Sequence, residues 1–351
     1  MAKKKQKNGL RSTLIVLSVV LGIILAVLIA GTVYAEFLLG KVNYVDPDAT
    51  QPTYAQEIVD AIINETEPAD PEFTGPELKE EDVVLETAAP VEVDSENVVN
   101  ILLIGADRRK NEPARSDSMI LCTFNKTQGT ITLTSFMRDM YVKIPGYASN
   151  RINASYVLGG IPLLNKTIAH NFGVEADGAV EIDFAHFEDL IDLLGGIEIE
   201  LTSAEANYIN AECYGKLRSG VQTLSGKEAL SYSRCRSVGG EGDFNRTNRQ
   251  RVVLSTLLNE YKSKSLTDLM GMLDDILPMV TTNMTNAEII SLATEGLPML
   301  SASRIDTLRI PVDGTFQQGD VQVRPGLKDW FQYDIDFAAN REILREIFDA
   351  D

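Results

Sequence analysis

The sequence has few of the residues on which many hydrolases and small secreted domains depend. Its 351 residues include three cysteines and two histidines. An odd number of cysteines does not make a disulfide framework, and a chain of this length can bury a core without one. His170 and His186 stand alone on predicted helices, which argues against a zinc hydrolase or a histidine-based triad. A P-loop pattern is also missing, because the glycine pairs at 159–160 and 195–196 are typical of helix ends and turns.

Positive charge is scarce as well. The chain has 32 lysines and arginines against 51 acidic residues, a net charge of −19. A general nucleic-acid-binding protein needs a basic surface to neutralise phosphates, so that class is excluded. No internal repeat is visible, which argues against a solenoid.

The amino-terminal segment predicts a membrane anchor. Residues 1–11 form a basic tail, and residues 12–35 carry no charge and include about 21 consecutive, mostly apolar residues. About 20 such residues cross the roughly 30 Å hydrocarbon core of a bilayer. The positive-inside rule then places the amino terminus in the cytoplasm and the rest of the chain outside the cell. A cleaved signal peptide is the alternative, although its apolar core is usually about 7 to 15 residues long.

Residues 36–96 predict an extracytoplasmic stalk. They contain 17 acidic residues, two lysines and six of the 13 prolines. Such a composition cannot bury a core, although residues 54–65 predict one helix. The tail carries +5 and this stalk −15, so residues 97–351 hold the remaining −9 of the net charge.

Residues 97–351 predict a single catalytic domain of the α/β class. Residues 97–105 are typical of a buried strand, and residues 119–124 and 130–136 predict a hairpin. Further strands are predicted at 141–144, 179–182, 197–201 and 304–311, and helices at 153–158, 162–172, 184–194, 203–212, 225–232, 245–263, 265–277, 286–297 and 337–348. This order predicts a layered α/β/α domain with a central mixed β-sheet.

Within this acidic domain, residues 232–251 contain five arginines and no lysine. The planar guanidinium group binds two phosphate oxygens at once, so an all-arginine cluster favours an oxyanion site. An extended YSRCR segment at 232–236 would place Arg234 and Arg236 on one side. A following helix would bring Arg246, Arg249 and Gln250 to meet them, across a glycine-rich loop at 239–242. The alternative is a solvated basic helix that makes surface ion pairs.

A second charged group follows the first predicted strand. Asp107 and Asp117 flank Arg109 and Arg115 in one polar loop. Ligands bind beyond strand ends in open α/β sheets, and carboxylates together with arginines suggest a phosphate bound through Mg²⁺. The alternative is that the two carboxylates cap turns and pair with neighbouring arginines.

Six motifs in order resemble the LytR-CpsA-Psr family of cell-wall enzymes. They lie at residues 102–119, 135–142, 151–160, 177–199, 224–236 and 243–251, and they read LLIGADRR…RSDSM, SFMRDMYV, RINASYVLGG, DGAVEIDFAHFEDLIDLLGGIEI, LSGKEALSYSRCR and DFNRTNRQR. The resemblance covers about residues 98–255. It implies a phosphotransferase, outside the membrane, that moves a glycopolymer such as teichoic acid or capsular polysaccharide from undecaprenyl pyrophosphate to peptidoglycan, with Mg²⁺ or Mn²⁺.

The same resemblance implies roles for particular residues. Asp107 and Asp117 match the metal ligands, and Arg115 matches the arginine implicated in phosphoryl chemistry. The pyrophosphate contacts match Arg109, Arg138, Arg151, Arg234, Arg236, Arg246 and Gln250. Arg151 replaces the usual lysine, and Met137 replaces the usual proline before Arg138. The general base is left open between Asp243 and Asp139.

Two other function classes stay open. A membrane-anchored sensor or regulator would bind a polyprenyl phosphate without turnover and would need no metal, whereas a pyrophosphate hydrolase would use water as the acceptor. A Cys213–Cys235 disulfide behind the arginines is also an open alternative to free thiols.

Overall fold

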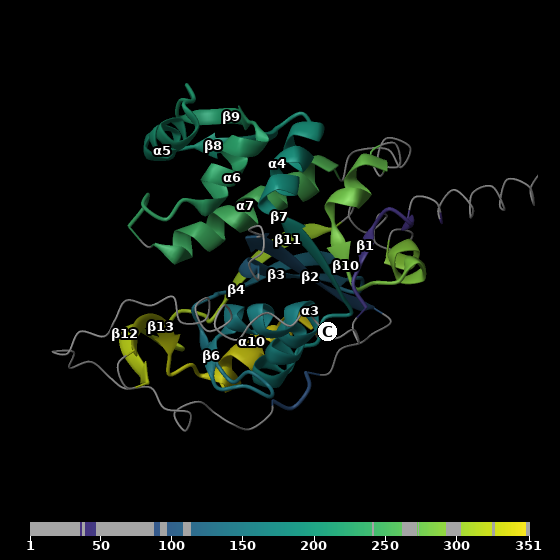
Figure 1. Cartoon of the computed structure of the whole chain (residues 1–351), viewed down its shortest axis with the longest axis vertical. Coiled ribbons are helices and arrows are strands. Elements are labelled where there is room, and N and C mark those ends of the chain that lie inside the picture. The colour runs from purple at the N-terminus through teal and green to yellow at the C-terminus, as the bar shows by residue number, and fades with distance from the viewer. Residues whose placement is uncertain are drawn as a thin grey trace, which may run out of the picture.

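The computed structural model is built on a seven-stranded β-sheet with helices on both faces (Figure 1). The structure describes residues 36, 39–46, 88–91, 97–107, 114–240, 242–261, 272, 274–292, 303–324 and 327–348. The predicted anchor at 12–35, the helix at 54–65 and Arg109 lie outside these residues, as do most of the stalk and parts of the predicted helices at 265–277 and 286–297. No helix in the described part of the chain is long and apolar enough to cross a bilayer.

The sheet is mixed, as the sequence predicted. Its strands in spatial order are β1 (Asn43–Tyr44), β10 (Thr281–Thr282), β7 (Gly178–Asp183), β2 (Val98–Asp107), β3 (Arg115–Asn125), β4 (Thr130–Phe136) and β11 (Arg304–Ile310). Three central strands, β2, β3 and β4, form an antiparallel meander. On the two sides of the meander, β7 pairs in parallel with β2, and β11 pairs in parallel with β4.

Side chains of β3 alternate between two buried layers. Met119 and Leu121 belong to the larger hydrophobic core, while Ile120 and Cys122 belong to a separate cluster on the other face. Alternate residues of a strand point to opposite faces, so an apolar run such as this must be covered on both sides.

Helices supply that cover. α3 (Ile152–Phe172) and α10 (Phe337–Phe348) lie below the sheet in Figure 1, and α7 (Asp243–Tyr261) lies above it. Leu254 and Leu258 of α7 pack on the β3 side chains of the upper face. The arginine-rich helix is therefore fixed directly on the sheet.

A second core lies beyond α7. It joins α4 (Phe184–Leu193), α5 (Ser203–Cys213), α6 (Gly226–Arg234) and the small sheet of β8 (Ile197–Leu201) and β9 (Gly220–Leu224). A capping box starts α5, in which the Glu205 backbone N–H donates to Thr202 Oγ1 at 3.2 Å and the Thr202 N–H donates to Glu205.

The predicted break between helices 153–158 and 162–172 is present inside α3. Gly159 and Gly160 leave helical geometry, and Gly160 has a φ of 59°. A Cβ at Gly159 would lie 2.6 Å from the Cβ of Leu163, so a larger residue does not fit this bend without a shift.

A carboxy-terminal hairpin was not predicted from the sequence. β12 (Gln317–Arg324) and β13 (Leu327–Tyr333) pair in antiparallel fashion, and they lie beside the short strands β5 (Tyr141–Val142) and β6 (Asn150–Arg151). The Gln332 N–H donates to the Asp139 carbonyl at 2.9 Å, which ties the hairpin to the segment after β4.

The extended strand predicted at residues 232–236 is wrong, and the choice left open between a Cys213–Cys235 disulfide and free thiols is decided for free thiols. The segment is not an extended strand, because α6 continues to Arg234 and the chain turns at Cys235. Cys213 and Cys235 are also free thiols. The Cys213 thiol instead donates to the Lys227 carbonyl at 3.7 Å, whereas Cys235 is buried.

Candidate functional site

A β-bulge places Asp117 at the site. β2 and β3 pair in regular register until Gly105 lies opposite Ser118, and then the register shifts so that Ala106 lies opposite Ser116. Asp117 is therefore an extra residue with no partner across the ladder. A bulge of this kind bends the strand and redirects a side chain.

Arg138 lies at the centre of the charged cluster, just after β4. Its Nη1 atom is 2.7 Å from Asp117 Oδ1, and its Nε atom is 3.3 Å from Asp139 and 3.7 Å from Asp243. Burial acts to lower the pKa of this guanidinium, but the three carboxylates outweigh it and raise the pKa. One planar cation thus holds three anions in position.

Asp117 is ionised in this setting. Burial acts to raise its pKa, but Arg138 and Arg246 outweigh that effect and the pKa is lowered. Arg246 Nη1 lies 3.9 Å from Asp117 Oδ1.

Asp243, the first residue of α7, shows the opposite shift. Its Oδ2 atom accepts a hydrogen bond of 2.9 Å from Arg246, and its Oδ1 atom is 3.3 Å from Arg236 Nε. Burial nevertheless raises its pKa, with a further contribution from the charge of Asp139. Two neighbouring carboxylates with opposite pKa shifts are typical of acid–base sites.

Arg246 itself is 3% exposed, and burial together with Arg138 lowers its pKa to about 10. It is therefore still charged at neutral pH.

Arg151 connects this cluster to the hairpin. Its Nε atom is 3.2 Å from Asp139 Oδ1. Its Nη2 atom contacts Asp329 and also donates to the Trp330 carbonyl at 3.0 Å. The guanidinium carbon also lies 4.7 Å from the ring centre of Phe331. The side chain is thus held by charge, hydrogen bonding and stacking at once.

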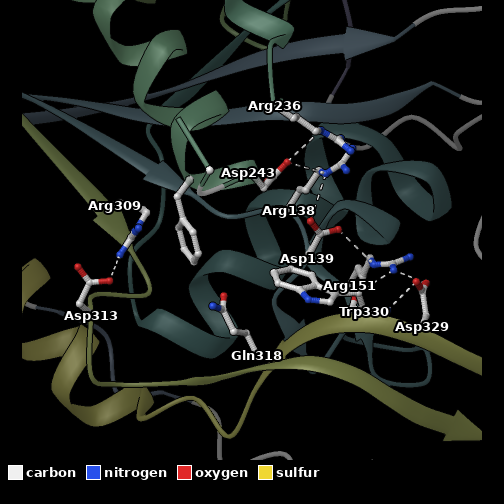
Figure 2. Close-up of a pocket in the computed structure, with 13 residues that line it drawn as sticks. Arg138, Asp139, Arg151, Arg236, Asp243, Arg309, Asp313, Gln318, Asp329 and Trp330 are labelled. Carbon is white, nitrogen blue, oxygen red and sulfur yellow. Dashed lines mark hydrogen bonds and ion pairs between the residues drawn. The ribbon is translucent and has the colours of Figure 1, made fainter. Parts of the chain in front are cut away.

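A cavity of about 830 Å³ opens beside these groups (Figure 2). Its lining is rich in both charges and comprises Arg138, Asp139, Arg151, Arg236, Gly240, Gly242, Asp243, Phe244, Arg309, Asp313, Gln318, Asp329 and Trp330. Arg309 lies across the cavity from Arg151 in Figure 2, pairs with Asp313 and stacks 4.3 Å from the ring centre of Phe244. Four arginines therefore face one space, each beside a carboxylate.

Arg249 supports the site without lining the cavity. Its guanidinium donates to the carbonyls of Cys235 and Val238, each at 3.0 Å, and its Nε atom donates to Glu205 at 2.9 Å. It therefore fixes the loop that carries Arg236 between α6 and α7.

The structure brings most of the predicted site residues together. Arg138, Arg151, Arg236 and Asp243 line the cavity, and Asp117 and Arg246 contact the same charged cluster. Asp107 and Arg115 lie opposite each other across β2 and β3, and Gln250 is half-buried on α7. Arg234 is exposed and stacks over Phe184 at 4.7 Å, apart from the lining residues, because the helical backbone turns it away from Arg236.

Six lining side chains were not predicted from the sequence, namely Phe244, Arg309, Asp313, Gln318, Asp329 and Trp330. The only signal for Arg309 was the strand predicted at 304–311, whose end carries this residue. Gln318, Asp329 and Trp330 depend on the position of a hairpin that the local pattern did not indicate, and Asp313 lies in the connection that leads to it.

Two candidate metal ligands lie at or next to the bulge. Asp117 is held ionised, and Asp107 ends the neighbouring strand. Within the described residues no group of three or more histidine, cysteine or acidic side chains is arranged to hold a metal. Two carboxylates suit Mg²⁺, which keeps several water or substrate oxygens as ligands.

Known proteins resemble this chain in sequence and in fold. A model of the LytR_cpsA_psr family matches residues 69–329. The polyisoprenyl-teichoic acid–peptidoglycan teichoic acid transferase TagU of Bacillus licheniformis is 36% identical over 197 residues, which are 56% of this chain. The match spans 63% of the length of TagU. The regulatory protein MsrR of Staphylococcus aureus is 29% identical over 262 residues, which are 74% of this chain and 77% of MsrR.

A solved structure shares the fold and carries a lipid. It is the LytR-CPS2A-psr family protein YwtF (TagT) of Bacillus subtilis with bound octaprenyl pyrophosphate lipid. The match has a TM-score of 0.56 and 25% identity, and it covers 76% of this chain and 97% of that one.

Proposed function

Because the chain belongs to the LytR-CpsA-Psr family, we propose that it moves a glycopolymer from an undecaprenyl pyrophosphate carrier to a sugar hydroxyl of peptidoglycan. The names of TagU and of the lipid-bound TagT structure support this donor class. The observation that carries the proposal is the set of four arginines that face one cavity beside a buried carboxylate with a raised pKa.

The arginines suit a pyrophosphate. Each guanidinium has five N–H donors, and a carboxylate partner uses only some of them. Arg236 has 47% of its side chain exposed and Arg138 has 18%, so incoming phosphate oxygens meet Arg236 first and Arg138 deeper in the cavity. Catalysis of phosphoryl transfer depends on such positioning and on neutralising charge at the transferring group.

The proposed reaction forms one bond to phosphorus and breaks one. The acceptor hydroxyl oxygen attacks the polymer-side phosphorus, the bond from that phosphorus to the bridging oxygen breaks, and undecaprenyl phosphate leaves. Asp243 accepts the hydroxyl proton, since its raised pKa makes it the stronger base of the cluster, and Asp139 is the alternative base. Arg115, half-buried at the start of β3, remains the candidate for contact with the transferring phosphoryl group.

Asp107 and Asp117 would hold Mg²⁺ or Mn²⁺. When bound, the cation supplies positive charge to the phosphate oxygens. Arg138 keeps Asp117 ionised and in place, which is the contribution of the chain itself.

We also propose that residues 12–35 anchor the protein and that the catalytic domain lies outside the cell. External protease should then digest the domain on intact spheroplasts, whereas a cytoplasmic domain would be protected.

One experiment separates the three function classes. The purified full chain in detergent is incubated with polyprenyl-pyrophosphate-linked polymer and peptidoglycan oligomers, and the phosphorus is followed. Polymer phosphate bound to the oligomer supports the transferase, and free polymer phosphate supports a hydrolase. Tight binding of the lipid with no product would support a regulator, a class that the name of MsrR favours.

A further inference from the structure

One wall of the cavity differs chemically from the arginine-rich wall. It is formed by the hairpin of β12 and β13, and it presents Trp330 and Gln318 to the cavity (Figure 2). Trp330 is the only tryptophan of the chain and remains partly exposed there. Neither residue takes part in the reaction steps described above.

The register of the hairpin explains this wall. Gln318 lies opposite Gln332, and Asp320 lies opposite Trp330. Directly opposed residues of an antiparallel pair share a face, so these four side chains project from one side of the hairpin. The other side carries Val321 and Phe331, which are buried in the main core. The side with Val321 and Phe331 also carries Asp329, which lies opposite Val321 and pairs with Arg151. The other side is polar apart from the indole of Trp330, and Asp329, Trp330 and Gln318 all line the cavity.

This wall is rigidly held. The backbone carbonyl of Trp330 accepts a hydrogen bond of 3.0 Å from Arg151, and the backbone N–H of Trp330 donates to Asp329 Oδ1 at 2.8 Å. The neighbouring Phe331 packs edge-on against Tyr141, with ring centres 5.4 Å apart. These contacts fix the backbone from which the Trp330 side chain projects, so less conformational entropy is lost when a ligand binds to this wall.

The same face also contains an unsatisfied amide. Gln332 is fully buried, and neither its Nε2 nor its Oε1 atom has a hydrogen-bond partner within the described residues. A buried amide without partners is costly, and because Gln332 is not among the residues that line the cavity, a bound water is its expected partner.

A sugar ring has the chemistry that this wall requires. The C–H groups on one face of a pyranose pack on an indole, and the hydroxyl and acetamido groups at its edge need hydrogen-bond partners such as a glutamine amide. We propose that the β12–β13 wall is the subsite for the acceptor saccharide, with Trp330 as its platform and Gln318 as a hydrogen-bonding partner. This inference rests on the proposed transferase function and adds where the acceptor binds.

The position of the wall fits an acceptor. Arg151 contacts both Asp139, beside the arginine cluster, and Asp329, beside Trp330. A saccharide on Trp330 therefore lies next to the carboxylates that are the candidate bases, while the arginines face the donor phosphates. The contacts of Arg151 with Asp139 and with Asp329 therefore link the donor wall to the acceptor wall.

A direct binding test uses the single tryptophan. Emission of the full chain in detergent is recorded while a tetrasaccharide of alternating N-acetylglucosamine and N-acetylmuramic acid is added. We expect a saturable change in emission, and no change with maltotetraose or with inorganic pyrophosphate. Gln318→Ala keeps the tryptophan fluorophore and should lower the affinity for the tetrasaccharide about tenfold, which corresponds to about 1.4 kcal/mol of binding free energy. Gln222→Ala, on the distant strand β9, is the matched control and should leave the affinity unchanged.

Kinetics supply the second test. Trp330→Ala should raise the KM for the acceptor about tenfold, with the affinity for the lipid donor unchanged. Trp330→Phe retains an aromatic platform and should recover part of the loss, which a folding defect would not do. Tyr147→Ala removes an exposed aromatic residue outside the cavity and serves as the control.

Three outcomes would overturn the inference. One is a saturable emission change with the lipid-linked donor but not with the tetrasaccharide, which would assign Trp330 to a donor sugar. Another is an emission that neither ligand changes. The third is an unaltered acceptor KM in Trp330→Ala. Because the fluorescence titration needs no turnover, a chain that binds the tetrasaccharide but transfers nothing would reject the proposed reaction and retain the saccharide site.

Discussion

At the scale of single residues, Arg138 has the most connected position, because one guanidinium contacts Asp117, Asp139 and Asp243. A lysine ammonium keeps the charge but cannot span three carboxylates in one plane. We therefore expect Arg138→Lys to lower kcat/KM almost as far as Arg138→Ala, on the order of 100-fold. The measurement is transfer of labelled polymer to peptidoglycan oligomers. Arg304→Lys, at an exposed pair with Asp306, is the control; full activity of Arg138→Lys would mean that only the positive charge matters.

Asp243 should control the pH dependence of the reaction. Its pKa is raised by burial above the ordinary value of about 3.9, so the carboxyl group loses its charge, and its ability to accept a proton, as the pH falls through that higher pKa. Activity should therefore fall on the acidic side at a pH above the ordinary range of an aspartate. Asp243→Asn should lower kcat and remove this acidic limb. A limb that persists in the variant would assign the base role to Asp139.

The cysteines should behave as three separate thiols. Burial raises the pKa of Cys122 to about 12, and burial also raises the pKa of Cys213. Alkylation of the unfolded chain without reductant should add three labels by intact mass. In the folded protein the label should reach Cys213 before the buried Cys122 and Cys235. A single label in the unfolded chain would show that Cys213 and Cys235 form a disulfide.

The sequence predicted which charged residues belong to the site, but it did not predict the direction of every side chain. Arg138, Arg236 and Asp243 were identified from their residue type and from a family resemblance, and all three line the cavity. Arg234 shows the limit of that reasoning. Its spacing of two from Arg236 implied a shared side in a strand, but the helical backbone at Arg234 gives it a different direction and Phe184 as its partner.

At the scale of elements, the loop between α6 and α7 depends on Arg249. This side chain is 5% exposed and holds two loop carbonyls and Glu205. Arg249→Met should leave a partly buried carboxylate unpaired and lower the free energy of unfolding by about 3 kcal/mol. It should also weaken binding of polyprenyl pyrophosphate, because the loop positions Arg236. Thermal unfolding and lipid titration measure the two effects.

A double substitution tests whether the ion pair is the cause. Glu205→Gln should preserve the capping box of α5, so adding it to Arg249→Met should recover part of the lost stability. Arg218→Ala, at an exposed position, should change neither measurement. Strictly additive effects of the two substitutions would show that Arg249 and Glu205 act independently.

Elements with a strong apolar pattern were predictable, and those with a polar pattern were not. β3 contains the apolar run MILC and β4 alternates threonine with isoleucine and leucine, so their hairpin was identified from the sequence. In the sequence QQGDVQVR of β12 most residues are polar, and the burial of Val321 in a core distant in sequence stabilises its strand conformation. The segment at 232–236 was ambiguous for a related reason. The capping box at Ser225 predicts a helix that continues into it, whereas the spacing of its two arginines suggests a strand.

At the scale of the whole molecule, metal binding should be visible as stability. A ligand that binds only the folded state stabilises it by about 2.7 kcal/mol at a hundredfold excess over its Kd. Mg²⁺ at constant ionic strength should therefore raise the Tm of the full chain, and a chelator should reverse the change and stop transfer. Asp107→Asn and Asp117→Asn should each remove the Mg²⁺ response, whereas the exposed Asp306→Asn should retain it. A Tm that does not respond to Mg²⁺ in the wild-type chain would reject the metal site.

The pairing of distant segments sets when a growing chain can begin to act. β11 completes the sheet by pairing with β4, and Trp330 meets Arg151 from 179 positions away. Synthesis runs from the amino end, so the bulge, the central arginines and α7 all emerge before the last hairpin exists. During that interval the charged groups lack one wall, and no closed cavity can hold a substrate. If the chain has the proposed transferase activity, that activity therefore begins only when almost the whole domain has been made.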